Sequence, residues 1–271
     1  MGTICNVPVA LPNAPDLVLD LLEAHGGALA GQAICRAGVL LGHRESTMRV
    51  AMTRLLEAGK LGRRERGWYE LNPDGLKLRG MLDVWTRNVV EEVPWQREWV
   101  AVHDAHVGRA DKSLWRRHQL ALALRGFAEF EFGLKIRPAN RVGGVDVERR
   151  ELKGLGLAPM ATVFLLVDWD QESAQRAHRL WPTGELARDC AQCLAALDKH
   201  RRLLAKMPIE RALRESFLLG RAAVMLLIRD PLLPEALMNP QLRNALANEV
   251  RSYKSMAHGM WDAWLRTSPQ G

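Results

Sequence analysis

The stretch GHRESTMRVAMTRLLEAGKL, residues 42–61, places an amphipathic helix between two glycines. Its apolar side chains recur at the i, i+3, i+4, i+7 spacing of a helix that docks on a hydrophobic core. These side chains are Met48, Ala51, Met52 and Leu55. The N-cap position holds Arg44 or Glu45, and the better capping residue, Ser46, follows one step later. The pattern therefore predicts the helix but leaves its first residue open.

A second helical segment lies directly before this helix. It reads GALAGQAICRAGVLLG over residues 27–42 and is mostly apolar, and Gly42-His43 supplies a tight turn between the two segments. A helix, a glycine-containing turn and an amphipathic helix together predict a helix-turn-helix. In that arrangement the second helix lies in the major groove of DNA.

The stretch after the helix, GRRERGWYEL over residues 62–71, has the pattern of a β-hairpin. A turn-forming Arg-Gly pair stands beside two aromatic residues that favour strands. The basic side chains near the tip are Arg63, Arg64 and Arg66. Between residues 42 and 70 the chain has seven Lys or Arg against four Asp or Glu, so the basic excess is local. This hairpin is predicted to be the wing of a winged helix, placed against the DNA backbone or in the minor groove.

The outer face of the helix and the hairpin have the chemistry of a DNA-contact surface. Small hydroxyl groups reach base edges or phosphates without steric cost, and an arginine binds guanine or phosphate through two hydrogen bonds. A charged outer helix face is usually only solvated, but the basic hairpin that follows at once favours DNA. The predicted DNA-binding residues are Arg44, Ser46, Thr47, Arg49, Val50, Thr53, Arg54, Arg63, Arg64 and Arg66.

Composition limits the classes of protein without selecting one. The chain has 271 residues and a formal net charge of +7, which favours a polyanionic partner only mildly. Its length suggests two or three small domains. No apolar run approaches the length that spans a bilayer, and the first residues do not form a secretion signal, so we expect a cytoplasmic protein without membrane contact.

Four cysteines are too few to stabilise a chain of this size by disulfides, which favours a reducing compartment and free thiols. Cys190 and Cys193 stand at C-x-x-C spacing, but no second Cys or His pair stands at zinc-finger spacing. We interpret them as small residues on one helix face, and we expect no metal and no cofactor.

The middle of the chain carries the best strand signals. Apolar, β-branched runs at residues 97–105 and 162–170 flank a helical pattern at 112–127, a strand pair within 128–138 and a second helical pattern at 144–156. The order is βαββαβ, which predicts a ferredoxin-like domain.

The last hundred residues show apolar stripes at helical spacing. We expect the large apolar side chains of these helices to be core or dimer contacts rather than to line a ligand-binding pocket. They are Met225, Met256, Met260, Trp261 and Trp264. The sequence thus predicts an α+β protein of three domains. They are a winged helix-turn-helix with a linker helix at 1–90, a ferredoxin-like domain at 91–175 and a helical effector and dimerisation domain at 176–271.

Several landmarks resemble PaaX-type transcriptional regulators. The stretch MRVAMTRLLEAGKL followed by GWYELNPDG is similar to the amino-terminal winged helix of that family. WQREWVAVHDAH is similar to the opening of its middle domain, and RRHQLALALRGFAEFEFGLKIRPAN to the helix, Gly-Phe turn and Arg-Pro-x-Asn strand end that follow. RDPLLPEAL, residues 229–237, resembles the Asp-Pro-x-Leu-Pro signature of its helical domain.

The resemblance implies a function. Such regulators are generally homodimeric repressors of phenylacetate and related aromatic catabolism, and an aryl-acetyl-coenzyme A thioester releases them from operator DNA. It implies DNA contact for Arg49 and Arg54, with Ser46, Thr47, Val50 and Thr53 setting sequence preference. The implied effector is phenylacetyl-coenzyme A or another acyl-coenzyme A, whose binding residues the resemblance does not identify.

The chain departs from the family pattern at two places. The strand near residue 134, which in the family commonly carries a Trp before Ile-Arg-Pro, reads Leu134-Lys135 there, and the first middle-domain strand ends in the unusual HDAH, residues 103–106. If this region shapes the ligand pocket, the effector differs from phenylacetyl-coenzyme A.

The family's middle domain also resembles CRISPR-associated nucleases, which raises the alternative of a metal-dependent nucleic-acid-processing enzyme. Asp104, with His103, His106 and Asp168 or Asp170, would be its ligands, but their spacing is not that of a metal site. We expect Asp104 to cap the following loop and the protein not to be an enzyme. A DNA binder without an effector is the remaining alternative.

Overall fold

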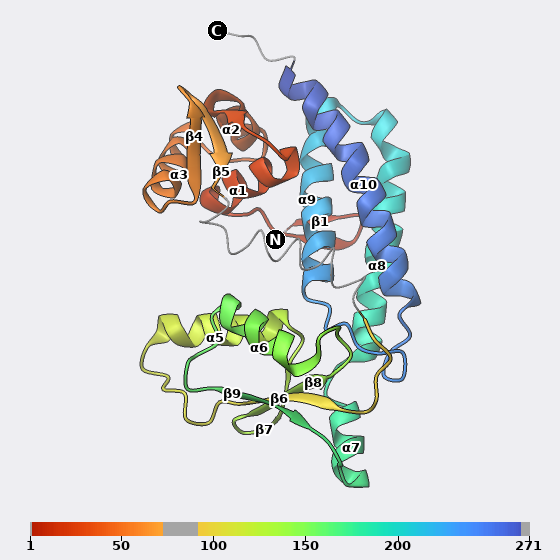
Figure 1. Ribbon diagram of the computed structural model, residues 1–271. Coiled ribbons are helices and arrows are strands. Elements are labelled where there is room, and N and C mark those ends of the chain that lie inside the picture. The colour runs from red at the N-terminus through yellow and green to blue at the C-terminus, as the bar shows by residue number, and fades with distance from the viewer. Residues whose placement is uncertain (1, 73–91, 267–271) are drawn as a thin grey trace. The chain divides into compact units, whose positions relative to one another are not determined.

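The computed structural model describes residues 2–72 and 92–266 and shows an α+β protein with more than one compact unit (Figure 1). The described part of the first unit comprises residues 2–72, 192–224 and 246–266, and that of the second comprises 92–191 and 225–245. The expected α+β multidomain class is therefore confirmed. The expected boundary at residue 90 and the linker helix before it lie outside the described residues, so both stay predictions.

The first part of unit 1 combines three helices with short strands. In chain order the elements are β1 (Gly2–Ile4), β2 (Val7–Val9), α1 (Ala14–His25), β3 (Leu29–Ala30), α2 (Gly31–Leu40), α3 (Glu45–Glu57), β4 (Leu61–Glu65) and β5 (Trp68–Leu71). Strands β1 and β2 form a hairpin, and a second, antiparallel sheet has the order β3-β5-β4.

Local chemistry explains where α1 begins and how α2 meets α3. The side chain of Asn13 accepts a hydrogen bond from the Asp16 amide at 2.9 Å, which caps the first turn of α1. In α2, a Cβ atom at Gly38 would overlap the side chain of Met48, which is fully buried on α3. Glycine at this position therefore allows α2 and α3 to pack closely.

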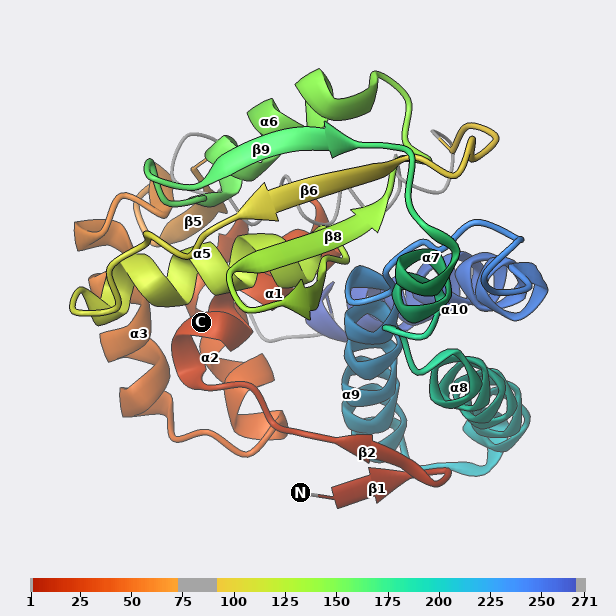
Figure 2. The ribbon, with the colours of Figure 1, turned by 90° about the horizontal axis from the view of Figure 1, so that it is seen from below.

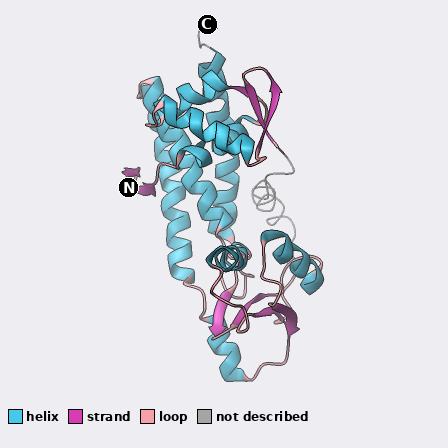
Figure 3. Ribbon diagram, turned by 90° about the vertical axis from the view of Figure 1, so that its left-hand side faces the viewer, coloured by secondary structure: helices cyan, strands magenta, loops and turns pink. Residues whose placement is uncertain are grey.

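Most of the length of three long helices belongs to unit 1, and residues 183–191, 225–228 and 241–245 at their ends belong to unit 2. The helices are α8 (Thr183–Leu203), α9 (Ile209–Ile228) and α10 (Gln241–Arg266), with a 3-10 turn η2 (Leu204–Lys206) after α8, and Figure 3 shows the three helices as long cyan ribbons. Between α8 and α10 the buried Tyr253 hydroxyl lies 2.8 Å from His200 Nδ1, and α9 contributes Glu215 at 3.5 Å from His200 Nε2. Burial lowers the pKa of His200, so the ring is a neutral hydrogen-bonding group of the core.

Unit 2 is built on one antiparallel sheet. Its elements are β6 (Trp99–His103), α5 (Lys112–Leu124), β7 (Ala128–Glu131), β8 (Leu134–Pro138), α6 (Gly144–Leu155), β9 (Thr162–Leu166) and α7 (Gln171–His178). The strand order is β7-β8-β6-β9, and every neighbouring pair is antiparallel (Figure 2). The strands and helices follow each other in the order expected from the sequence.

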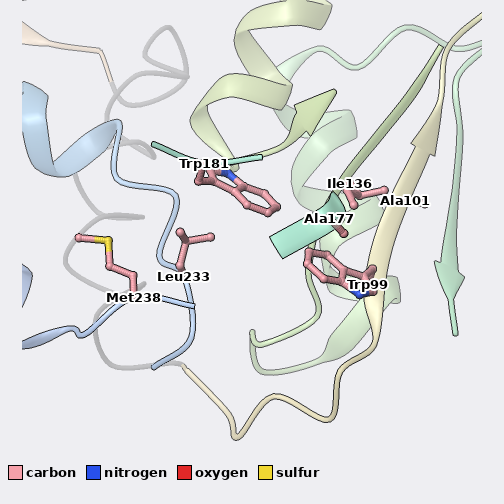
Figure 4. Packing of buried hydrophobic residues seen from close by; sticks show 7 residues of the cluster. All are labelled: Trp99, Ala101, Ile136, Ala177, Trp181, Leu233 and Met238. Carbon is pink, nitrogen blue, oxygen red and sulfur yellow. The ribbon is translucent and has the colours of Figure 1, made fainter. Parts of the chain in front are cut away.

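The two faces of this sheet pack against different partners, because side chains alternate along a strand. Val100 and Val102 of β6 pack with buried residues of α5 and α6. Trp99 and Ala101 point to the opposite face, where α7 and residues 180–187 and 233–238 cover them. Figure 4 shows this second cluster, in which the rings of Trp99 and Trp181 stack with their centroids 6.0 Å apart.

Two of the sequence landmarks meet in unit 2. Asn140, from the Arg-Pro-x-Asn strand end, donates a hydrogen bond to the carbonyl of Leu232 at 2.9 Å. Gly126, from the Gly-Phe turn, lies against Pro231 of the Asp-Pro-x-Leu-Pro segment and accepts a hydrogen bond from Trp181 Nε1 at 3.2 Å. These motifs are therefore contacts that hold the segment around Pro231 beside the sheet.

Gly126→Ala is expected to destabilise this contact by about 1–3 kcal/mol, the cost of a strained backbone position. Gly126 has φ 76°, and a Cβ there would lie 2.7 Å from Pro231 Cα. Gly154→Ala on α6 is the matched control, because nothing lies within 4 Å of a Cβ there, and alanine favours a helix over glycine. Urea unfolding should show a lower midpoint for the first variant and no loss for the second; equal midpoints would contradict the close contact.

A buried cluster of charges joins α5, α6 and β8. Arg125 donates two hydrogen bonds to Glu148, at 2.7 Å and 2.6 Å, and all of these side-chain groups are shielded from solvent. Arg137, fully buried, donates to the Arg125 carbonyl at 2.8 Å and to Asn140 at 2.9 Å. Burial alone would raise the pKa of Glu148, but the hydrogen bonds from Arg125 and the charges of Arg137 and Arg125 hold it at about 2. Burial lowers the pKa of Arg137 to about 10.

Candidate nucleic-acid interface

Helix α3 separates its two faces as the sequence predicts. Met48, Ala51, Met52 and Leu55 are buried, and all seven predicted contact residues from Arg44 to Arg54 are exposed. Val50 is exposed to 50%, which is unusual for a large apolar side chain and leaves it available to a partner. The helix begins at Glu45 with Arg44 at the N-cap and no side-chain cap, so Ser46 does not cap it.

The turn before α3 is held by the chain just before α1. Gly42 has φ 101°, a left-handed conformation that favours glycine. The side chain of His43 donates from Nε2 to the carbonyl of Pro12 at 2.9 Å, and the Leu11 side chain lies against Gly42. Sequence inspection missed this anchor because its partners are about thirty positions apart and no local pattern joins them.

The two arginines on the outer face of α3 differ in their surroundings. Arg49 lies 2.6 Å from Glu45 one turn earlier, and the hydrogen bond that Arg49 donates to this carboxylate raises the pKa of Arg49. Arg54 forms no ion pair with another residue in the described parts of the chain. Both side chains are exposed, so a phosphate or a base edge can reach either of them.

Strands β4 and β5 form the predicted hairpin. Gly67 in its turn has φ 82°, and the register shifts between Arg63 and Glu65, which marks a bulge at Arg64. The predicted basic side chains, Arg63, Arg64 and Arg66, are exposed. The Gly31 amide at the start of α2 donates to the Gly67 carbonyl at 2.8 Å, which ties the hairpin to the helices.

Trp68 is a candidate contact that the sequence analysis did not single out. It begins β5 beside the turn, and 41% of it is exposed. The sequence pattern marked it only as a residue that favours strands. An aromatic ring exposed beside basic side chains is available for contact with a partner, so Trp68 is a further candidate beside the ten predicted residues.

Asp104 does not cap the following loop as expected. Its buried carboxylate accepts hydrogen bonds from His118 Nε2 at 2.9 Å and from Lys135 Nζ at 3.0 Å. The Ala158 amide donates to Nδ1 of the same imidazole at 3.2 Å, so the ring carries its proton on Nε2. Burial acts to raise the pKa of Asp104, but His118 and Lys135 lower it below its ordinary value.

The other residues named for the alternative metal site do not gather around Asp104. The rings of His103 and His106 contact each other edge to face, and Asp170 caps α7 by accepting from the Ser173 amide at 2.8 Å. Within residues 2–72 and 92–266, no three His, Cys, Asp or Glu side chains lie close enough to hold a metal ion.

Lys135 of β8 and Asp104 of the HDAH stretch lie in contact. Lys135 Nζ forms an ion pair with Asp104 Oδ2 at 3.0 Å. The backbone register places Lys135 opposite Val102 and Leu134 opposite His103. Asp104 and Lys135 are therefore the two halves of one buried ion pair.

Cys190 and Cys193 are buried on one side of α8, and neither forms a disulfide, which agrees with their interpretation as small residues on a helix face. Burial raises the pKa of Cys190 to about 11, so its thiol stays protonated and unreactive near neutral pH. Among the described helices, none is long and apolar enough to cross a membrane.

Comparison with known proteins shows the fold but no family. No family model matches the chain, and no curated protein matches its sequence. Among solved structures, the chain is similar to an uncharacterized protein, Rv0674, from Mycobacterium tuberculosis, with a TM-score of 0.61 and 21% identity. The match covers 93% of this chain and 98% of that one. The likeness is therefore one of overall chain fold along nearly the whole length of both proteins.

Proposed function

We propose that this protein is a DNA-binding transcriptional regulator that reads DNA with α3 and the β4–β5 hairpin. The element order α1, β3, α2, α3, β4, β5 and the strand order β3-β5-β4 support a winged helix-turn-helix. One observation carries the proposal. All ten predicted contact residues are exposed, while the apolar side of the same helix is buried.

The order of strands and helices in unit 2 supports an inference about the fold of that unit. Its βαββαβ order, with strand order β7-β8-β6-β9 and both α5 and α6 against one face, supports a ferredoxin-like domain. Together with the landmarks that resemble PaaX-type regulators, it favours a cytoplasmic, homodimeric repressor of a phenylacetate-like catabolic operon. In this proposal an aryl-acyl-coenzyme A thioester releases the protein from its operator.

The mechanism follows from the geometry of a two-fold dimer. Each protomer would place one α3 in the major groove, with half-sites about one helical turn, 10 base pairs, apart or a multiple of it. Bound in this way, the dimer blocks access of the transcription machinery to the promoter. For full release, the effector must bind the state that cannot hold DNA about 10⁴-fold more tightly than the other.

Equilibrium binding to the DNA upstream of the protein's own gene and of neighbouring genes tests the proposal. Fluorescence anisotropy at fixed salt should show tight binding to one of these fragments and weaker binding to a scrambled one. Phenylacetyl-coenzyme A should then lower the affinity. Tight binding that no acyl thioester changes would leave a constitutive DNA binder, and no specific binding would overturn the proposal.

No observation favours the nucleic-acid-processing enzyme over a regulator. Lys135 and His118 already hold the Asp104 carboxylate, so a positive charge stands where a divalent ion would have to bind. Asp104→Asn is therefore expected to affect the stability of unit 2 rather than strand cleavage. Cleavage of DNA or RNA that requires a divalent metal ion and disappears in this variant would revive the alternative.

Removing two wing arginines together, Arg63→Ala with Arg66→Ala, is expected to flatten the salt dependence of DNA binding. Each lost phosphate contact lowers the slope of log K against log salt by about one unit, with little change in sequence preference. Arg202→Ala with Arg211→Ala removes two exposed arginines from α8 and α9 and should leave the slope unchanged. An unchanged slope in the wing variant would place the hairpin away from the DNA.

A further inference from the structure

Unit 1 contains a cavity beside the N-terminal hairpin. Its volume is about 350 Å³, within the range of small-molecule sites. In Figure 2, β1 and β2 run close to α9, which provides the opposite wall. The lining residues are Gly2, Val9, Ala10, Leu11, Arg214 and Leu218.

The cavity is apolar except for one cation. Val9 and Leu218 are almost fully buried, and Leu11 presents a large exposed apolar surface. Arg214 is exposed and, among the described residues, forms no hydrogen bond or ion pair. Arg211, one turn earlier on α9, is by contrast paired with Glu215 at 2.8 Å. The cavity therefore offers an apolar wall and a guanidinium with its donors available.

We propose that this cavity binds a small apolar anion, an aryl or short alkyl carboxylate, whose carboxylate pairs with Arg214. An arginine binds a carboxylate through two parallel hydrogen bonds, and the hairpin residues cover the apolar body. The small volume fits such a molecule better than the whole of a nucleotide-bearing thioester.

The wall of the cavity continues into the turn before α3. Leu11 lines the cavity and also lies against Gly42, and the next residue, Pro12, accepts the hydrogen bond from His43. A ligand that moves Leu11 therefore acts directly on the turn that positions α3. This part of the inference rests on the proposed function, because it requires α3 to contact DNA.

Isothermal titration calorimetry on the full chain without DNA tests the site. The probes are phenylacetate, hexanoate and the neutral phenylacetamide, which has the shape of phenylacetate without its charge. We expect both carboxylates to bind and the amide to bind about tenfold more weakly, since a charge-assisted pair is lost. Failure of both carboxylates to bind, or equal binding of phenylacetate and the amide, would overturn the proposal.

Variants of the cavity residues test whether phenylacetate binds in this cavity. Arg214→Gln should weaken phenylacetate binding about tenfold, and Arg211→Gln, the matched control on the same helix, should not change it. Ala10→Phe places a ring in the cavity from an exposed position and should also weaken binding, with circular dichroism used to check its fold. Unchanged binding in Arg214→Gln would place the ligand elsewhere and overturn the assignment.

Adding phenylacetate to the protein–DNA complex then tests the link to DNA. The affinity for DNA should fall for the native chain and not for Arg214→Gln. Because calorimetry needs no DNA, the two proposals can fail separately. Ligand binding without DNA binding would overturn the proposed function alone, and DNA binding without ligand binding would overturn the cavity alone.

Discussion

Arg54→Ala is expected to abolish specific DNA binding, and Arg49→Ala is expected to do the same, while the protein stays folded. Both side chains stand on the exposed face of α3, and neither contributes to the buried side that packs on the core. A lost bidentate contact to guanine costs roughly tenfold to a hundredfold in affinity. A dimer that reads two half-sites loses each contact twice, so the effect on the complex multiplies.

The ion pair between Arg49 and Glu45 makes the Arg49→Ala and Arg54→Ala variants differ in their dependence on Glu45. Arg49 must exchange this carboxylate for DNA, whereas Arg54 has no ion pair to break in the described structure. Glu45→Gln should therefore strengthen DNA binding in the native background and have no effect when Arg49 is already alanine. Anisotropy titrations of the native chain, Glu45→Gln, Arg49→Ala and the double variant measure this coupling directly.

Arg211→Ala is the control for both arginines. Arg211 is exposed on α9 and pairs with a glutamate one turn away, as Arg49 does on α3. Its removal changes the net charge equally and should leave specific binding unaltered. Full affinity in the Arg49 and Arg54 variants, with circular dichroism unchanged, would mean that a different helix enters the groove.

Glu148→Gln is expected to destabilise unit 2 strongly, by about 3–5 kcal/mol. Removing one partner of a buried ion pair leaves the other charge without compensation. Here Glu148 faces the paired Arg125 and also the fully buried Arg137. Glutamine keeps the volume but not the charge, so the loss reports the electrostatic part of the contact.

Glu131→Gln is the matched control, because Glu131 also pairs with an arginine, Arg176, but on the surface of the same unit. An exposed pair of this kind adds little to stability. Urea unfolding at neutral pH should therefore show a large fall in midpoint for Glu148→Gln and almost none for Glu131→Gln. Equal effects would contradict the burial of the cluster.

The same cluster sets a pH dependence. The pKa of Glu148 is about 2 in the folded chain, below its ordinary value of 4.5. A lowered pKa stabilises the folded state above the unfolded value, and this contribution disappears as the pH falls from about 4.5 to about 2. The difference in unfolding free energy between the native chain and Glu148→Gln should therefore shrink in that interval. A constant difference would show that the charge is not its source.

Much of the fold could be predicted from local patterns. The period of apolar residues located α3 and its buried face, and a Gly-Phe turn and strand-like runs located the elements of unit 2 in order. The exposed positions followed from the same period, because a helix that buries Met48 and Leu55 must turn Val50 and Arg54 outward. The local period of apolar residues is sufficient to predict an element and its buried face wherever one face of that element is buried.

The contacts between distant residues could not be predicted in this way. Nothing near Pro12 indicates that its carbonyl holds His43, and nothing near Asp104 indicates a hydrogen bond from His118. The expectation that Asp104 caps a loop failed because a partner on the neighbouring strand, Lys135, outcompetes the local backbone. Strand register decides such pairs, and register depends on the whole sheet.

The pairing of Asp104 with Lys135 has a consequence for recombining segments of this chain with those of other proteins. A chain that has only one of the two residues carries a buried charge without its ion-pair partner, and a chain that has both carries a neutral pair. Replacing either residue alone with an uncharged one is therefore disfavoured, whichever of the two is replaced. Positions 104 and 135 should therefore be exchanged together when segments of this protein are recombined with those of a relative.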